Sequence, residues 1–315
     1  MLASSKKFKR VMFLIAHLSD GGAGSAAAHS ELYWLRLPAA TGWPAVSRLD
    51  QTLIGVWVGV AAAGIYSVPF MLMNSLGYML AYMLGFIFPM ASELQSLGQM
   101  DRLRDIFIRS SQFIAALAGL VFIPLFVLGD LFLALWTPTI STKVAGVLQL
   151  LALAGYIGTL TATLPNSVMV GLGKMRQFTI YTTIRAIVLA AFCFIFIHPL
   201  GIEGAGWALL FTCSVDIVYF YIFLRRYVQI APSLLLQKAY LKPIILGIGF
   251  VALTFLCRPF AISWIGFAAV GLGLTLIYIS TGYAIGVFGE TEKRALVGLW
   301  GIVKSLVHYR YLSNS

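Results

Sequence analysis

The chain has 315 residues, of which 60% are apolar and 10% are charged, and its mean hydropathy is +0.91. About 25% of the residues in a soluble domain are charged, so this chain has too few charges to present a hydrated surface to water. The composition therefore excludes an ordinary soluble protein. It predicts an all-α fold, a polytopic transmembrane helix bundle in contact with the lipid bilayer.

Residues 1–46 form an atypical N-terminal segment. The stretch KKFKRVMFLIAHLS combines basic residues with a short apolar run, as a signal peptide does. It is followed by GGAGSAAAHS and then by LRLPAATGWP, which contains two prolines and an Arg. We therefore expect no stable transmembrane helix between residues 20 and 46.

From residue 63 onward the chain contains apolar runs that are long enough to cross a membrane, because a spanning helix needs about 20 apolar residues. The runs do not alternate with period two, which excludes barrel strands. Continuous helices also satisfy their own backbone hydrogen bonds in lipid. The seven predicted spans are residues 63–92, 107–136, 144–171, 176–198, 203–224, 241–260 and 264–288.

The Lys and Arg residues fall in short clusters between these spans, and the clusters predict the orientation. If the first span enters from outside, the inward loops hold Arg102, Arg104, Arg109, Lys174, Arg176, Arg225, Arg226, Lys238, Lys242, Lys293, Arg294, Lys304 and Arg310. The outward loops hold Lys143 and Arg258. The positive-inside rule then places the C-terminus in the cytoplasm. The net charge of +11 is thus distributed as a topology signal, and we expect no nucleic-acid partner.

Residues typical of catalytic and metal sites are scattered along the chain. The three cysteines, Cys193, Cys213 and Cys257, lie in or at the edge of apolar spans, without metal-ligand or disulfide spacing. The sequence GLGKMRQ is a weak echo of a phosphate-binding loop, but no strand precedes it, so we interpret it as a tight cytoplasmic turn. We therefore expect no enzyme activity, no cofactor and no metal site.

Two charged residues, Arg185 and Asp216, stand deep within predicted spans, where a charge costs at least ~2.5 kcal/mol. Arg185 lies nine residues beyond Arg176, and Asp216 lies nine residues before Arg225. Each is therefore about 14 Å from the cytoplasmic end of its helix. If the two helices are antiparallel neighbours joined by the turn HPLGIEGAG, the two side chains lie at one level and can pair.

This pair has two interpretations. It is either a buried ion pair that holds two helices together, or a site in which Arg185 faces a cavity and binds an anionic diphosphate or an acidic sugar. Arg suits the second task because its planar fork can bind two oxygen atoms.

Polar residues at helical spacing give further candidates, although polar side chains also hold membrane helices together. Gln177, Tyr181 and Arg185 share one stripe, while Thr212, Asp216 and Tyr219 share another. The resulting substrate-cavity candidates are Arg185, Asp216, Gln177, Tyr181, Asn74 and Tyr78.

A series of short pieces between residues 48 and 227 carries a family resemblance. In chain order they are RLDQTLIG, GIYSVP, FPMASELQSLGQ, LFLALW, LQLLALAGYI, VMVGLGKMRQF and HPLGIEGAGWALL. Their order and spacing resemble the polysaccharide-transporter branch of the multidrug, oligosaccharidyl-lipid and polysaccharide exporter superfamily. Its members include the flippases for O-antigen and exopolysaccharide repeat units. The resemblance covers a little over half of the chain.

The resemblance implies a fold of two six-helix lobes that rock around a central cavity, of which this chain matches only the C-terminal lobe. On this basis residues 47–229 are the flippase lobe, 230–288 are two additional transmembrane helices and 289–315 are a cytoplasmic tail. Arg48 and Asp50 lie within what should be a full span in such a protein. We therefore expect a partial chain, truncated, frameshifted or mis-started at its N-terminal end. The alternative is a shortened but working chain that acts as an oligomer.

The function that the resemblance implies is translocation of polyprenyl-linked oligosaccharide units across the bacterial inner membrane during biosynthesis of lipopolysaccharide O-antigen or exopolysaccharide. The expected partners are the lipid-linked oligosaccharide, the bilayer, and a missing N-terminal lobe or other polysaccharide-assembly proteins. Two alternatives remain open. One is a membrane-bound polymerase, ligase or acyltransferase of polysaccharide assembly, although the short outward loops disfavour an enzyme. The other is a drug or ion exporter of the same superfamily, because a shared fold does not define the substrate.

Overall fold

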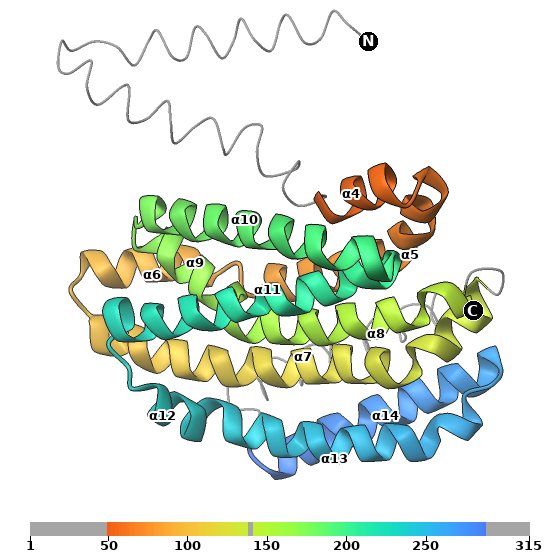
Figure 1. Ribbon diagram of the computed structural model, residues 1–315. Coiled ribbons are helices and arrows are strands. Elements are labelled where there is room, and N and C mark those ends of the chain that lie inside the picture. The colour runs from red at the N-terminus through yellow and green to blue at the C-terminus, as the bar shows by residue number, and fades with distance from the viewer. Residues whose placement is uncertain (1–48, 138–140, 288–315) are drawn as a thin grey trace, which may run out of the picture. The chain divides into compact units, whose positions relative to one another are not determined.

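Apolar runs separated by short charged turns fold as helices throughout residues 49–137 and 141–287, the part of the chain that the structure describes (Figure 1). The structure is a computed structural model. Its described residues contain helices and no strand, which confirms the predicted all-α bundle. The segment 1–46, Arg48 and the tail 289–315 lie outside the described residues.

The described residues contain seven helical segments that are long and apolar enough to cross a membrane, as the sequence predicts. The chain is therefore a multi-pass membrane protein. The segments are Val60–Ser96, Met100–Trp136, Val144–Gly171, Met175–Leu200, Ile202–Val228, Pro232–Phe260 and Trp264–Ala284.

Several of these segments consist of more than one helix. The elements in chain order are α4 (Leu49–Trp57), α5 (Val60–Met83), α6 (Ile87–Ser96), α7 (Met100–Trp136), α8 (Ser141–Gly158), η2 (Thr159–Thr163), α9 (Leu164–Gly171), α10 (Met175–Leu200), α11 (Ile202–Phe223), η3 (Leu224–Val228), α12 (Pro232–Leu235), η4 (Leu236–Tyr240), α13 (Leu241–Cys257), η5 (Arg258–Phe260) and α14 (Trp264–Ala284).

Exposed apolar side chains support the membrane assignment. Several apolar side chains on the long helices are at least 68% exposed, among them Val60, Phe194, Ile248 and Leu276. Apolar surfaces of this kind are unfavourable in water, but they are the normal lipid-facing surface of a membrane protein.

The first predicted span, residues 63–92, is not one continuous helix. A short helix, α4, precedes it and ends before Gly59, whose φ of 121° is accessible to glycine and rarely to other residues. The span itself breaks again between α5 and α6. Pro89 explains this second break. In a continuous helix, residue 89 would have to donate an N–H, which proline lacks, and the proline ring would clash with the carbonyl of Gly85.

A segment of π-helix, η2, interrupts the third span just before Pro165. Pro165 has no N–H to donate, and its ring would crowd the carbonyl one turn earlier in a regular α-helix. The wider π turn relieves that crowding, and π turns often occur in this way inside longer helices.

The buried side chains form two clusters. The larger one runs through the elements from α4 to η4 and includes Tyr66, Phe107 and Phe223. The smaller one joins α7 to α13 and α14 and includes Phe250 and Tyr278. Figure 1 shows α13 and α14 on the side of α7 that faces away from α10. The long helix α7 therefore contributes to both cores.

Hydrogen bonds at the two ends of α7 place neighbouring helix ends together. Near its beginning, Arg104 donates through Nε to the carbonyl of Val228 at 2.7 Å and through Nη2 to Oε1 of Gln229 at 2.7 Å. Near its other end, Asp130 forms an ion pair with Arg258. The segments that carry Arg104 and Gln229, predicted as inward loops, therefore lie at one end of the bundle, and Arg258 lies at the other.

Candidate functional site

The hairpin of α10 and α11 brings the two deep charges together. Gly201 joins the helices with a φ of 61°, and the helices then pack against each other as antiparallel neighbours. Nε of Arg185 donates to Oδ1 of Asp216 at 2.9 Å. The predicted pairing of these two residues is therefore confirmed.

Tyr181 belongs to the same cluster. It lies one helical turn before Arg185, and its hydroxyl donates to Oδ1 of Asp216 at 2.7 Å. Its ring stacks on that of Tyr219, with centroids 3.7 Å apart and an angle of 14° between the planes. Two residues of each predicted stripe thus meet across the hairpin, Tyr181 and Arg185 from α10 and Asp216 and Tyr219 from α11.

The cluster retains hydrogen-bonding capacity. Oδ2 of Asp216 and the hydroxyl of Tyr219 are buried and have no hydrogen-bond partner among the described residues. Both donors to Asp216 use the same oxygen, Oδ1. Since buried polar atoms are nearly always paired in folded proteins, this carboxylate can accept a further donor.

The exposure of the two charged partners differs greatly. The side chain of Asp216 is 0% exposed, whereas that of Arg185 is 36% exposed. Arg185 reaches Asp216 through Nε, and its Nη1 and Nη2 donate to no described residue. The far edge of the guanidinium, with its paired N–H groups, is thus available to bind an anion.

A second buried carboxylate lies nearby and was not among the candidates from the sequence. Asp50 on α4 is 1% exposed and accepts a hydrogen bond from the hydroxyl of Tyr66 on α5. Its Oδ1 also accepts from the backbone N–H of Gln51 at 2.8 Å. Helix α4 packs against α10, the helix that carries Arg185. Tyr66 lies 16 residues after Asp50. The spacing of residues along a single helix predicts no contact at that separation.

The remaining sequence candidates do not join this cluster through the contacts that the structure gives them. Gln177 is exposed at the beginning of α10. Asn74 donates to the carbonyl of Phe70 on its own helix at 3.1 Å, and Tyr78 is 56% exposed. Thr212, on the stripe of Asp216, is fully buried and donates to the carbonyl of Ala208. Tyr78 therefore lies on a face of α5 that the described helices leave open, whereas Asn74 is half-buried.

Among the described residues, no group of three or more His, Cys, Asp or Glu side chains is placed to hold a metal ion. All three cysteines are free thiols, and Cys193 and Cys213 are buried. The chemistry of the Arg185 cluster is that of charge and hydrogen bonding. It can bind an anionic group or exchange a hydrogen-bond partner within the membrane.

We compared the chain with family models, curated proteins and solved structures, and no match was found in any of the three.

Proposed function

We propose that the chain is a transporter lobe that translocates a polyprenyl-linked oligosaccharide across the bacterial inner membrane. The observation that carries the proposal is the state of Arg185. It is anchored at Nε by a buried carboxylate, while its two terminal amino groups have no hydrogen-bond partner among residues 49–137 and 141–287 and its side chain is 36% exposed. An arginine fixed in this way is suited to hold a phosphate or an acidic sugar at mid-membrane depth.

The position of Arg185 along its helix fits this role. It lies ten residues after Met175, the first residue of α10, and therefore about 15 Å along a helix of 26 residues. A charged residue at such depth is rare and normally serves a transport pathway or a partner charge. Asp216 supplies the partner charge that keeps the guanidinium in place between transport events.

In this proposal the described spans work with a second lobe. Transporters built from two related halves keep the substrate site at the interface between the halves. The open face of α5, which carries Tyr78, would meet that second lobe, and the half-buried Asn74 lies one turn away from Tyr78. The orientation in this proposal has the C-terminus in the cytoplasm, in accordance with the distribution of Lys and Arg.

A second candidate function is export of a cationic compound or exchange of an ion. The observation that favours it is the presence of two fully buried carboxyl groups, Asp50 on α4 and Asp216 on α11, on helices that both pack against α10, the helix of Arg185. When both carboxylates are ionised, the cluster carries a net negative charge. Such a cluster attracts cations or protons more readily than a lipid diphosphate.

Expression in cells that lack their own repeat-unit flippase tests the two candidates. The full chain is produced together with the N-terminal lobe of a related flippase, and surface polysaccharide is measured. We expect surface polysaccharide to be restored, to be lost in Arg185→Gln, and to be retained in Arg226→Gln, which removes an exposed charge away from the cluster. Resistance to cationic drugs without restored polysaccharide would favour the second candidate and contradict the first.

A further inference from the structure

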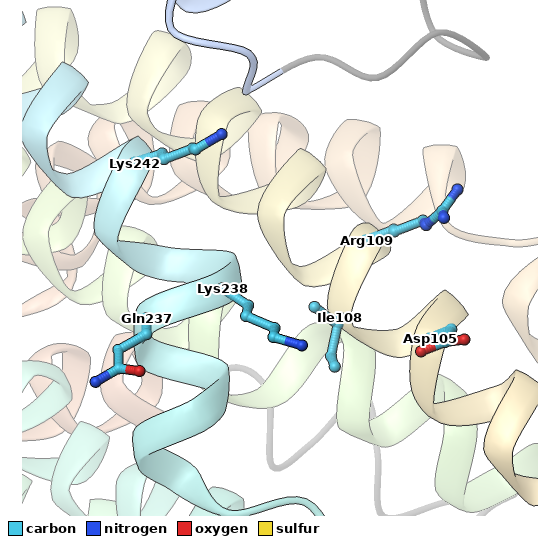
Figure 2. A pocket seen from close by; sticks show the side chains of 6 residues that line it. All are labelled: Asp105, Ile108, Arg109, Gln237, Lys238 and Lys242. Atoms are coloured by element: carbon cyan, nitrogen blue, oxygen red, sulfur yellow. The ribbon is translucent and has the colours of Figure 1, made fainter.

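A separate cavity of about 530 Å³ lies between the first turns of α7 and the elements η4 and α13. It is distant in sequence from the Arg185 cluster and shares no residue with it. Figure 2 shows the side chains that line it, which are Asp105, Ile108, Arg109, Gln237, Lys238 and Lys242.

The lining of this cavity is basic. Three of its residues are cations and one is a carboxylate, which leaves a net charge of +2. Arg109 and Lys238 form no ion pair or hydrogen bond with any described residue. Lys242 donates from Nζ to the carbonyl of Gly286 at 3.3 Å, a neutral partner. In Figure 2 the ammonium group of Lys238 extends from η4 toward α7, close to Ile108.

The cavity lies where the bilayer surface should be. Helix α7 has 37 residues and is about 55 Å long, which exceeds the ~30 Å of hydrocarbon that a bilayer offers. Its charged residues in the first turns end at Arg109, and the apolar run begins a few residues later. Arg109 therefore marks the level at which α7 passes from the head-group region into the hydrocarbon.

Exposed apolar residues lie beside the basic groups on the same helical segment. These apolar residues are Leu236, which is 51% exposed, Leu241, which is 48% exposed, and Ile245, which is 56% exposed. A ligand that fits both features has an anionic head and an apolar tail. A free anion would use the cations and leave the apolar surface unused.

We propose that this cavity binds the phosphate head group of an anionic phospholipid, such as phosphatidylglycerol. The basic side chains around the cavity attract the phosphate, with Lys238 extending across it from η4 toward α7, and the acyl chains lie along the exposed apolar residues of η4 and α13. Basic pockets between membrane helices are suited to anionic head groups, because each Lys or Arg near the membrane surface adds attraction to the lipid charge. The proposal does not depend on the transport function of the chain.

Native mass spectrometry of the purified full-length chain in neutral detergent tests this site. Phosphatidylglycerol is added in a titration, and the bound fraction is compared with that of zwitterionic phosphatidylcholine. The site variant is Arg109→Gln/Lys238→Gln. The matched control is Lys174→Gln/Arg176→Gln, which removes the same charge from the exposed start of α10.

We expect one phosphatidylglycerol to bind in preference to phosphatidylcholine, and its dissociation constant to rise roughly 30-fold in the site variant, since two cations are lost. The control should keep wild-type binding, and Arg109→Lys/Lys238→Arg should keep most of it. Inorganic phosphate at millimolar concentration should not displace the lipid. Equal losses in the site variant and the control, equal binding of phosphatidylcholine, or full displacement by inorganic phosphate would each overturn the proposal.

Discussion

Arg185 and Asp216 lie 31 residues apart and meet through one hydrogen bond, from Nε of the arginine to Oδ1 of the aspartate at 2.9 Å. This geometry anchors the guanidinium on one side and leaves its terminal amino groups unpaired among the described residues. Pairs of arginine with a carboxylate are frequently bidentate, which is the stronger arrangement. Because this pair uses Nε alone, we propose that the terminal amino groups of Arg185 bind the substrate.

The first prediction concerns the hydrogen bond between Tyr66 and Asp50. Tyr66→Phe removes the hydroxyl that donates to a carboxyl group only 1% exposed, so this buried polar group loses its side-chain donor. We expect the free energy of unfolding to fall by about 1–3 kcal/mol, the usual cost of an unsatisfied buried group. Unfolding in mixed detergent micelles, followed by tryptophan fluorescence, measures the change.

The control for this change is Tyr78→Phe. Tyr78 is 56% exposed on the same helix, and its hydroxyl forms no hydrogen bond with a described residue. Its replacement should leave the free energy of unfolding unchanged. Equal stability of the two variants would show that the Tyr66 hydroxyl does not support Asp50.

The second prediction concerns the close approach of α10 and α11 at Gly204. A Cβ at this position would lie 2.1 Å from the carbonyl oxygen of Phe196, a backbone atom that cannot rotate away. Gly204→Ala should therefore separate the helices that carry Arg185 and Asp216. We expect a loss of about 1–3 kcal/mol in stability, as in other overpacked cores, and a lower folded yield by size-exclusion chromatography.

Gly273→Ala is the matched change in an open position. A Cβ at Gly273 meets no atom within 4 Å, and alanine is the better helix former. Folded yield should be equal to or higher than that of the wild type. A folded yield of Gly204→Ala as high as that of Gly273→Ala would contradict the packing seen between α10 and α11.

Much of the bundle follows from the sequence because span length and polarity are local properties. The number of spans follows from the apolar runs. The pairing of Arg185 with Asp216 follows from counting residues to the charged ends of two neighbouring helices. Helix rise is constant, so equal distances from one membrane surface place two residues at one level.

Other features depend on contacts that no local pattern encodes. The division of the first span into α5 and α6 results from Pro89 together with glycine, whereas Pro69 and Pro124 lie inside continuous helices. The tie between Asp50 and Tyr66 depends on how α4 folds back on α5 after Gly59. The spacing of residues within one helix predicts neither the break between α5 and α6 nor the contact between Asp50 and Tyr66.

The third prediction concerns orientation. In a Cys257→Ser background, Ile262→Cys should be labelled in intact cells by a membrane-impermeant maleimide, because residue 262 is 71% exposed beyond the predicted outward end of α13. Lys238→Cys, at the opposite end of the same span, should be labelled only after the membrane is permeabilised. The physical reason is the excess of Lys and Arg in the loops at the end that carries Lys238. The reverse labelling pattern would invert the topology.

The central claim, that Arg185 binds the anionic group of the substrate, is tested most directly by Arg185→Gln/Asp216→Asn. The double variant removes both charges, so no buried carboxylate is left unpaired and the helices should still fold. It is expressed in flippase-deficient cells with the N-terminal lobe of a repeat-unit flippase, and surface polysaccharide is measured per folded molecule in the membrane. Our account predicts wild-type folded amounts with polysaccharide export reduced at least about 100-fold, since a charged hydrogen-bonding contact is worth roughly 3 kcal/mol. Normal folding with wild-type export would contradict it, and would show that the pair serves only to hold α10 and α11 together.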